Sequence, residues 1–330
     1  MTANVFFAVS REARQWYWPP EVVARLHRVA DVVEPSSWST PWESCAGIEG
    51  LVVGWGAPRL PADVWRRLDS LRVVSIFGGS ASYIEEPIEL LRRGVTLANA
   101  SPEMGEAVAE EALALMLAGQ YGLVTSSTAH RNSGELTHEG GQTNRSLTGA
   151  TVGLIGFGFI GRKVAELLRP FAVRLLVYDP YVDPELIDRS GGQAVSLHEL
   201  LRESDVVSLH AGWTKETEGM LGSERLDLLR PGTLIVSTAR MPIFDQHALA
   251  QLVLSGSVRF ASDFIPYDQA VWATPEMRAS PHLIAVHGHT SVTQRSLYRM
   301  ARRVVRNIEQ VFAGEEPDNK MTEEWIIRTT

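Results

Sequence analysis

Short apolar runs alternate along this chain with segments whose apolar positions recur every three to four residues. Apolar runs that stop at glycines are typical of buried parallel strands, and the intervening spacing is typical of helices. This order predicts βαβ units and a parallel sheet. In the first part of the chain we expect strands within residues 5–10, 50–56 and 71–79, a helix running into a strand over residues 19–33, and a helix over residues 61–71.

The pattern changes at Pro102. Residues 102–124 have helical spacing without strong breakers, which predicts one long helix. Residues 125–149 are polar and glycine-rich, so we expect a loop with some helix there. A second α/β series follows, with strands expected within residues 151–161, 174–182, 205–211, 232–239, 259–264 and 282–288, and with a final helix over residues 294–314.

Composition narrows the choice of partners and compartment. The chain has 31 Lys and Arg against 39 Asp and Glu, a net charge of −8, which gives no support to a nucleic-acid or anionic-membrane partner. The basic residues of the final helix are therefore expected to form a solvated face. The single cysteine, Cys45, permits neither an internal disulfide nor a Cys-based zinc site. With no apolar run of ~18 residues and no secretory signal pattern, we expect a cytoplasmic protein.

The strongest motif is Gly156-x-Gly158-x-x-Gly161, which lies between an apolar strand and a helical run. In that context the first glycine makes a tight turn, the second lets the backbone approach a pyrophosphate, and the third lets helix and strand pack closely. The helix N-terminus adds free N–H groups and the positive end of the helix dipole. The motif therefore predicts a dinucleotide site rather than an ordinary glycine-rich turn.

Asp179 ends the next apolar run after the glycine motif. A carboxylate at that position can accept both ribose hydroxyl protons of the adenosine half, and it repels a 2′-phosphate. We therefore expect NAD as the cofactor, rather than NADP. The alternative is an acid that merely caps the turn at the end of a strand.

The position of the glycine motif predicts the domain organisation. The motif begins only after a complete α/β series, and 330 residues suffice for about two domains. We expect an α/β fold of two parallel-sheet domains, Rossmann-like or flavodoxin-like, with an active-site cleft between them. Residues 1–100 with 290–330 would form the substrate domain, and residues 101–289 the NAD-binding domain.

Two histidines, His287 and His289, flank one glycine after the last apolar run. Histidine changes charge near neutral pH and is also the commonest metal ligand, so each ring is a candidate proton donor, metal ligand or polar residue at a strand end. No cysteine or acid lies close to the pair in sequence. We therefore predict no metal site.

The chain resembles the D-isomer-specific 2-hydroxyacid dehydrogenases from about Leu51 to Gly314. Besides the glycine motif, the resemblance rests on a helix, a His-x-x-x-Thr segment leading to an Ala-Arg pair, an acidic strand end and the histidine segment. The sequence departs from the family at Ser237, where Asn is usual, at Met241, where Gly is usual, and at Val286, where Pro is usual. The four segments are residues 108–117, 208–240, 261–269 and 285–293.

The resemblance implies hydride transfer between NAD and a small 2-keto or D-2-hydroxy acid. Arg240 would grip the substrate carboxylate and carbonyl, because a guanidinium fork binds a carboxylate bidentately and keeps its charge near neutral pH. His287 would donate the proton. Asp268 stands at the position of the family's catalytic acid and would raise the pKa of His287. Gln269 is a rival partner if the loop is shifted by one residue.

The same resemblance implies the cofactor contacts. Phe159 and Ile160 would present backbone N–H groups to the pyrophosphate. His210 and Thr238 would border the far half of the cofactor, and Asp263 would hold the nicotinamide carboxamide.

Substrate contacts are expected from both domains. Gly78 and Gly79 would offer backbone N–H groups to the substrate carboxylate. Trp55 is a candidate for limiting substrate size, and His289 for lining the pocket. The resemblance also implies a homodimer built on the long helix near residues 108–117.

Two alternatives remain open. The departures around Arg240 and His287 also suit a non-catalytic, NAD-sensing binding protein on the same scaffold. Formate dehydrogenase-like activity shares the fold, but that branch has Gln where this chain has Asp268.

Overall fold

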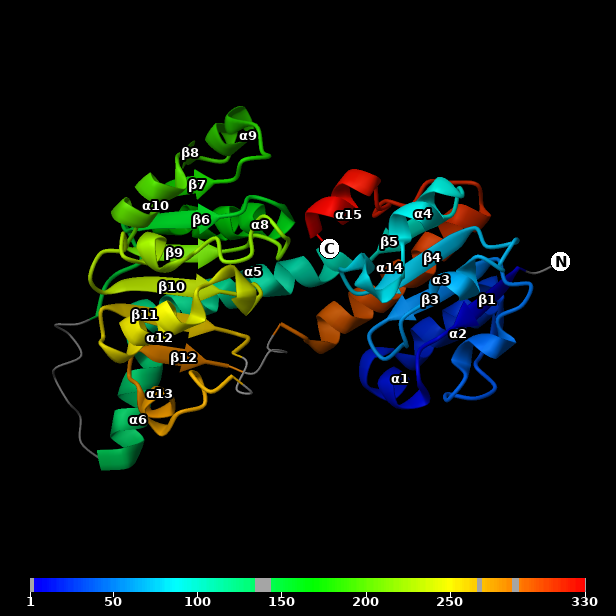
Figure 1. Cartoon of the computed structure of the whole chain (residues 1–330), viewed down its shortest axis with the longest axis horizontal. Helices are drawn as coiled ribbons and strands as arrows, with labels where there is room; N and C mark the ends of the chain where they lie inside the picture. Colours follow the sequence, from blue (N-terminus) through cyan, green and yellow to red (C-terminus); the bar gives the residue numbers. More distant parts are fainter. Residues whose placement is uncertain (1–2, 134–143, 266–268, 287–290, 330) are drawn as a thin grey trace. The chain divides into compact units, whose positions relative to one another are not determined.

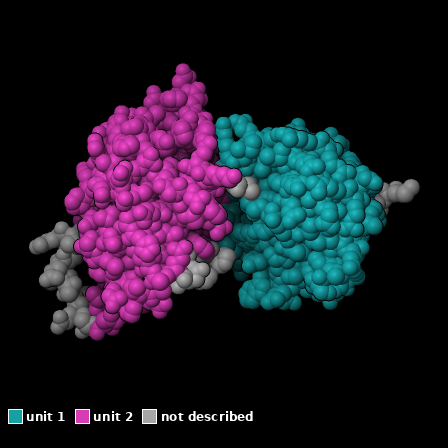
Figure 2. Space-filling model, viewed as in Figure 1, with its two compact units in different colours: residues 1–104, 292–330 teal, residues 105–291 magenta. Residues whose placement is uncertain are grey.

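The computed structural model describes residues 3–133, 144–265, 269–286 and 291–329. The chain divides into two compact units (Figure 2), and each unit has its own sheet. Unit 1 comprises residues 1–104 and 292–330, and unit 2 comprises residues 105–291.

Unit 1 is built on a five-stranded sheet in the order β2-β1-β3-β4-β5, with every strand pairing parallel (Figure 1). This is the flavodoxin-like order. Its strands are β1 (Asn4–Phe7), β2 (Asp31–Val33), β3 (Gly50–Gly54), β4 (Val73–Phe77) and β5 (Thr96–Asn99). Its helices are α1 (Arg11–Tyr17), α2 (Pro20–Val29), α3 (Ala62–Trp65), α4 (Pro87–Arg92), α14 (Gln294–Phe312) and α15 (Glu323–Thr329), with short 3-10 turns at Pro41–Ser44 and Ala81–Tyr83.

Helix α14 returns to unit 1 from the end of unit 2 and completes its core. The helix begins with a capping box between Thr293 and Ser296. Its apolar face buries Met300, Val304 and other residues against the sheet. The Ser75 hydroxyl of β4 donates to the Val304 carbonyl at 3.1 Å, so a buried hydrogen bond fixes the helix on the sheet.

Unit 2 is built on a seven-stranded sheet in the order β12-β11-β10-β9-β6-β7-β8, also parallel throughout. The order reverses between β6 and β9, as in a Rossmann sheet. Its strands are β6 (Thr151–Ile155), β7 (Arg174–Tyr178), β8 (Gly192–Ala194), β9 (Val206–Leu209), β10 (Thr233–Ser237), β11 (Val258–Ser262) and β12 (Leu283–Ala285). Its helices are α6 (Leu123–Ser133), α8 (Phe159–Leu168), α9 (Pro184–Arg189), α10 (Leu197–Glu203), α11 (Ser223–Leu226), α12 (Gln246–Leu254) and α13 (Pro275–Ala279), with 3-10 turns at Arg169–Phe171 and Met241–Ile243.

The two parallel sheets confirm the predicted α/β class, but several element boundaries differ from expectation. The long helix, α5 (Ser101–Gln120), ends four residues before the predicted 124. Gly122 there adopts a left-handed φ of +58°, which favours glycine, and the chain continues as α6 where mainly loop was expected. The helix expected over residues 61–71 is the four-residue α3. The short strands β5 and β8 were not predicted.

Helix α5 crosses unit 2 from one edge of the sheet to the other. A Cβ atom on Gly105 would lie 2.6 Å from the Phe159 ring, at the start of α8. A Cβ atom on Gly119 would lie 2.6 Å from Leu234, at the start of β10. The helix therefore begins its course in unit 2 at the carboxyl edge of the sheet and reaches the amino edge ~21 Å further along its axis.

Within the described ranges, no single helix is both long and apolar enough to cross a membrane. Only Ser101–Gln120 taken together with Leu123–Asn132 meets the length and composition required, and these two helices meet at a bend of 57°.

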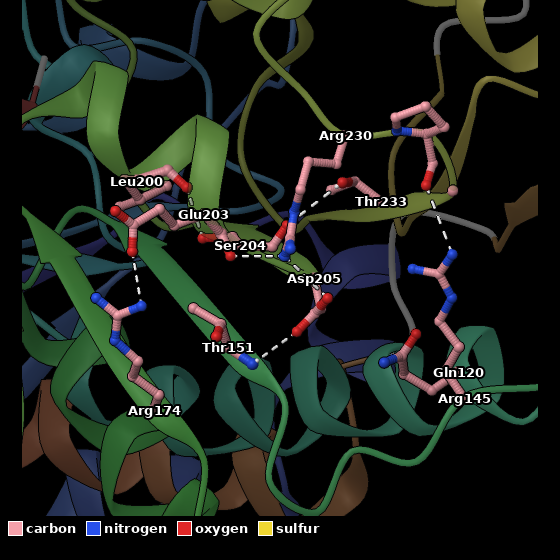
Figure 3. Close-up of polar contacts among 12 residues, drawn as sticks. Gln120, Arg145, Thr151, Arg174, Leu200, Glu203, Ser204, Asp205, Arg230 and Thr233 are labelled. Carbon is pink, nitrogen blue, oxygen red and sulfur yellow. Dashed lines mark hydrogen bonds and ion pairs between the residues drawn. The ribbon is translucent and has the colours of Figure 1, made fainter.

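A charged network ties together the amino ends of the unit 2 strands (Figure 3). Asp205, just before β9, accepts from the Thr151 N–H at 2.9 Å and from the Arg230 guanidinium at 2.9 Å. Arg174, at the start of β7, donates to Glu203 at 2.6 Å. This edge is therefore closed by hydrogen bonds, whereas the loops at the carboxyl edge carry most of the predicted site residues of unit 2.

We expect Asp205→Ala to destabilise the protein by about 1–3 kcal/mol, because it removes the acceptor of the Thr151 N–H and leaves the Arg230 guanidinium only the Glu203 carbonyl. Urea-induced unfolding measures the change. Asp188→Ala, on the exposed face of α9, is the matched control and should stay within about 0.5 kcal/mol of the unsubstituted protein. Equal midpoints for the two variants would contradict a stabilising role for the network.

Candidate functional site

The glycine motif forms the turn between β6 and α8. Gly156 has a φ of +94°, and a Cβ atom there would lie 2.7 Å from the Ala211 backbone nitrogen. A Cβ atom on Gly161 would lie 2.3 Å from the Gly156 carbonyl oxygen. No atom lies within 4 Å of a Cβ built on Gly158. The fold itself therefore requires two of the glycines, while Gly158 leaves an open approach to the backbone.

The first turn of α8 faces this open approach. The helix begins at Phe159 with Gly158 as its N-cap, and no side chain caps it. The first N–H groups of a helix have no acceptor within the helix, so those of Phe159 and Ile160 remain available to an anionic ligand.

Asp179 follows β7 and is fixed beside the glycine loop. One carboxylate oxygen accepts from the Phe157 N–H at 2.7 Å, and the other from the Tyr181 N–H at 2.9 Å. The side chain therefore caps the turn, as the alternative interpretation expected. A carboxylate has about four acceptor positions, so these two bonds leave further lone pairs for ribose hydroxyls.

Sequence reasoning missed a second contact in this region. The Tyr181 hydroxyl donates to the carboxylate of Glu216, in the loop after β9. Both residues are exposed and far apart in the sequence, so no local pattern indicated their pairing.

His210 lies directly after β9. Its N–H donates to the Ile155 carbonyl at 2.8 Å, and its Nε2 shares a hydrogen bond with the Ser208 hydroxyl at 2.9 Å. Burial lowers the pKa of His210 to about 4, so the ring is neutral at pH 7. This residue can border a ligand there, but it does not supply a positive charge.

Arg240 lies just beyond β10, at the carboxyl edge. Its guanidinium carbon is 5.5 Å from the centre of the Phe264 ring, a cation–π contact. Within the described parts of the chain, no carboxylate forms an ion pair with Arg240, so its fork is free to bind a carboxylate. Thr238, the other predicted residue of this loop, is half-buried beside it.

Asp263 follows β11, and its N–H donates to the Ser237 carbonyl at 3.4 Å. Its Oδ1 is buried and accepts no hydrogen bond from any described residue. Burial, and next the charge of Glu111, raise the pKa of Asp263 to about 7, while the nearby Arg240 opposes the shift. The carboxyl group is therefore about half protonated near neutral pH.

Glu111, on α5, is a second site residue that the sequence analysis missed. It is only 9% exposed, and neither of its carboxylate oxygens has a hydrogen-bond partner among the described residues. A signal was present: Glu111 lies three residues after Val108 and four before Leu115, on the apolar stripe of the helix. The neighbouring Glu110 is exposed.

The predicted residues of unit 1 gather at the carboxyl edge of its own sheet. Trp55 follows β3, and its N–H donates to the Phe77 carbonyl at 3.0 Å. Its ring packs edge-on against Tyr17 and Phe77, each with a centroid distance of 5.6 Å. A Cβ atom on Gly78, where φ is +144°, would lie 3.3 Å from the Trp55 indole nitrogen. Gly79 continues the loop after β4, so two successive residues there carry no Cβ atom, and a Cβ on Gly79 would lie 3.2 Å from the Ser101 side chain.

Three predicted residues, Asp268, His287 and His289, lie outside the described residues. Gln269, the rival partner for His287, is described and exposed. Val286 precedes the histidines, and its N–H donates to the Ser262 carbonyl at 3.0 Å, at the ends of β12 and β11. In the described ranges, no three His, Cys, Asp or Glu side chains are grouped so that they could hold a metal ion.

Comparisons with known proteins place this site in context. Residues 112–283 match the family model described as the NAD binding domain of the D-isomer specific 2-hydroxyacid dehydrogenases. The chain is 30% identical to a glyoxylate reductase of Thermococcus kodakarensis over 273 residues, 81% of each protein. It is 29% identical to a D-3-phosphoglycerate dehydrogenase of Mycobacterium leprae over 78% of this chain. That match spans about half, 48%, of the length of the relative.

The fold has a close counterpart among solved structures. The ligand-free D-mandelate dehydrogenase of Rhodotorula graminis aligns over 98% of both chains with a TM-score of 0.84 and 22% sequence identity. At that identity, the likeness is one of fold.

Gly158→Ala and Gly161→Ala should separate ligand binding from folding. The first adds a methyl group in open space, so we expect an unchanged unfolding temperature and at least a ~10-fold loss of NADH affinity, because the backbone can no longer approach a pyrophosphate. The second forces a methyl group against the Gly156 carbonyl and should lower both the unfolding temperature and the NADH affinity. Fluorescence titration with NADH and thermal unfolding measure the two effects. Full NADH affinity in Gly158→Ala would contradict a dinucleotide at this loop.

Proposed function

Because the chain belongs to the D-isomer specific 2-hydroxyacid dehydrogenase family, we propose that it is an NAD-dependent oxidoreductase acting on a small 2-keto or D-2-hydroxy acid. The proposal rests on one observation. The carboxyl edge of the unit 2 sheet carries an open glycine loop, the Asp179 carboxylate and the Arg240 guanidinium. No described carboxylate forms an ion pair with Arg240. These are the groups needed to bind a dinucleotide and an organic acid at one edge.

The residues divide the chemistry among them. The bound nicotinamide supplies the hydride. Arg240 holds the substrate carboxylate and stabilises negative charge that develops on the ketone oxygen. His287 holds a proton on its ring and donates it to that oxygen. Asp268 keeps the imidazole protonated, with Gln269 as the rival partner.

In this proposal the two units have different tasks. Unit 2 corresponds to the NAD-binding domain predicted over residues 101–289. It binds NAD through Phe159, Ile160 and Asp179. Unit 1 corresponds to the substrate domain predicted over residues 1–100 and 290–330. It binds the substrate carboxylate through the N–H groups of Gly78 and Gly79. Trp55 limits substrate size, because its ring contacts on Tyr17 and Phe77 make it a rigid wall.

The remaining proposed contacts follow the same scheme. His210 and Thr238 border the far half of the cofactor, and His289 lines the substrate pocket. We also propose a homodimer that uses α5 and the segment after it, where Tyr121, Leu123 and Val124 are exposed.

A steady-state assay of NADH oxidation tests the function. The panel is glyoxylate, pyruvate, hydroxypyruvate and phenylpyruvate, with formate and NAD as the reverse-direction control. Turnover with one or more keto acids supports the proposal. Tight NADH binding without turnover on any acid would favour an NAD-sensing binding protein. Oxidation of formate would favour formate dehydrogenase-like activity.

We expect a clear preference for NADH over NADPH in kcat/KM, because the Asp179 carboxylate would face a 2′-phosphate. Asp179→Ala should erode this preference by removing the repulsion, at some cost to NADH affinity. Asp183→Ala, at the exposed N-cap of α9, is the control and should leave the ratio unchanged. A preference for NADPH in the unsubstituted protein would overturn the assignment of NAD.

The two histidines should respond differently. His287→Ala should lower kcat by ~10²–10⁴-fold, the range for a lost general acid, with NADH affinity nearly unchanged. His289→Ala should change KM more than kcat. Asp268→Asn should shift the pH profile of kcat/KM towards lower pH, because the protonated imidazole loses its stabilising charge. Loss of turnover in His289→Ala but not in His287→Ala would reverse the two roles.

A further inference from the structure

Glu111 is a buried carboxyl group of unit 2 whose charge acts on the half-buried Asp263, and the family resemblance implies a role only for Asp263. Glu111 is 9% exposed, and both of its oxygens lack a hydrogen-bond partner among the described residues. The Oδ1 atom of Asp263 is in the same condition. Three buried carboxyl oxygens without donors on two interacting residues are unusual, because buried polar atoms are nearly always hydrogen-bonded.

The course of α5 places Glu111 in the part of unit 2 that also contains the end of β11. The helix contacts the start of α8 at Gly105, and Glu111 follows six residues, or ~9 Å, further along the helix. Its neighbours Ala109 and Ala112 are buried in the same apolar cluster as Ala261, which lies two residues before Asp263. Glu111 thus approaches the end of β11 from the helix that underlies the sheet.

The charges around the pair do not neutralise it. In the described part of unit 2, the charged groups that act on Asp263 are Glu111 on α5 and Arg240 after β10. Arg240 is exposed and lies over Phe264, so it offsets the two carboxylates only in part. Burial and the charge of Glu111 both disfavour the ionised form of Asp263 and raise its pKa.

A purely structural role does not account for the pair. A buried acid stabilises a fold when it accepts hydrogen bonds, and none reach these three oxygens from the described residues. An apolar residue at position 111 would suit the helix better, since Val108, Ala112 and Leu115 around it are buried. The unpartnered oxygens instead suit a ligand that brings its own donors.

We propose that Glu111 and Asp263 hold a single proton between them and together bind the primary carboxamide of the nicotinamide ring. The ionised carboxylate accepts from the amide N–H, and the protonated carboxyl donates to the amide carbonyl oxygen. A lone carboxylate could recognise only the N–H, whereas the pair matches both ends of the amide. This inference rests on the proposed function and adds Glu111 to it as a cofactor-selecting residue.

The pair makes cofactor binding depend on pH. The pKa of Asp263 is about 7, so the shared proton is present below that pH and is lost above it. The affinity for NADH should therefore fall as the pH rises, by roughly tenfold per unit above about 7. Glu111→Gln replaces the neighbouring charge by an amide that itself donates, so its affinity should stay nearly constant over the same range.

Calorimetric titration of the full-length protein with NADH at about pH 6, 7 and 8 tests the proposal. The same titration uses the reduced 3-acetylpyridine dinucleotide, which lacks the N–H donors, and the reduced nicotinic acid dinucleotide, which carries a carboxylate. We expect the unsubstituted protein to prefer NADH over both analogues by roughly tenfold or more at pH 6. Glu110→Gln, the same change at the adjacent exposed residue, should behave like the unsubstituted protein.

An infrared spectrum of the ligand-free protein gives a second readout that needs no cofactor. A protonated carboxyl has its own carbonyl-stretch band, which should be present at pH 6 and lost by about pH 8, and which Glu111→Gln should weaken or shift. Circular dichroism checks that each variant is folded. This measurement on the unsubstituted protein stands even if Glu111→Gln fails to fold.

The outcomes separate this inference from the proposed function. If NADH binds and turnover occurs, but Glu111→Gln keeps the pH dependence of the unsubstituted protein, the carboxyl pair is overturned and the dehydrogenase stands. Equal affinity for NADH and the acetylpyridine analogue likewise overturns the carboxyl pair and leaves the dehydrogenase assignment standing. If the pair behaves as expected in binding while no keto acid is reduced, the inference stands and the catalytic assignment falls. If NADH does not bind at all, both fall.

Discussion

The contact between Gly161 and the Gly156 carbonyl is the constraint on which the functional edge of unit 2 depends. A Cβ atom at position 161 would lie 2.3 Å from that oxygen, so the first turn of α8 can approach the end of β6 only because the residue is glycine. The same approach turns the N-terminus of α8 towards the open space at Gly158. It also brings the Phe157 N–H within 2.7 Å of the Asp179 carboxylate. One close packing contact thus positions both an anion-binding helix end and the acid beside it.

The two edges of the unit 2 sheet have opposite physical character. At the amino edge, carboxylates and guanidiniums satisfy one another and the backbone, as in the Asp205 network. Towards the carboxyl edge, buried atoms of Asp263 and Glu111 have no hydrogen-bond partner among the described residues, and the exposed Arg240 forms no ion pair with any of them. Unsatisfied polar groups cost stability, so a fold retains them chiefly where a ligand supplies the missing partner.

The departures from the family pattern have local explanations. Met241, where glycine is usual, lies in a 3-10 turn with its side chain buried, and no left-handed φ is needed there. Ser237, where Asn is usual, still makes a side-chain turn, because its hydroxyl accepts from the Ala239 N–H at 3.3 Å. These substitutions therefore preserve the loop that presents Arg240. Because the loop is preserved, the altered motif by itself does not indicate a protein without catalytic residues.

Sequence alone determined the features that depend on neighbours along the chain. Most strand positions, the glycine turn and Asp179 follow from spacing within about 30 residues, because hydrogen bonding and side-chain direction in these elements are periodic. It could not separate the packing glycines Gly156 and Gly161 from the open Gly158, because that difference depends on atoms of other strands and helices. It likewise did not reveal that the charge of Glu111 acts on Asp263, because the two residues lie on elements distant in sequence. Only the tertiary structure, in which α5 and β11 share one apolar core, decided which acid is buried, which is solvated, and which oxygens are left without donors.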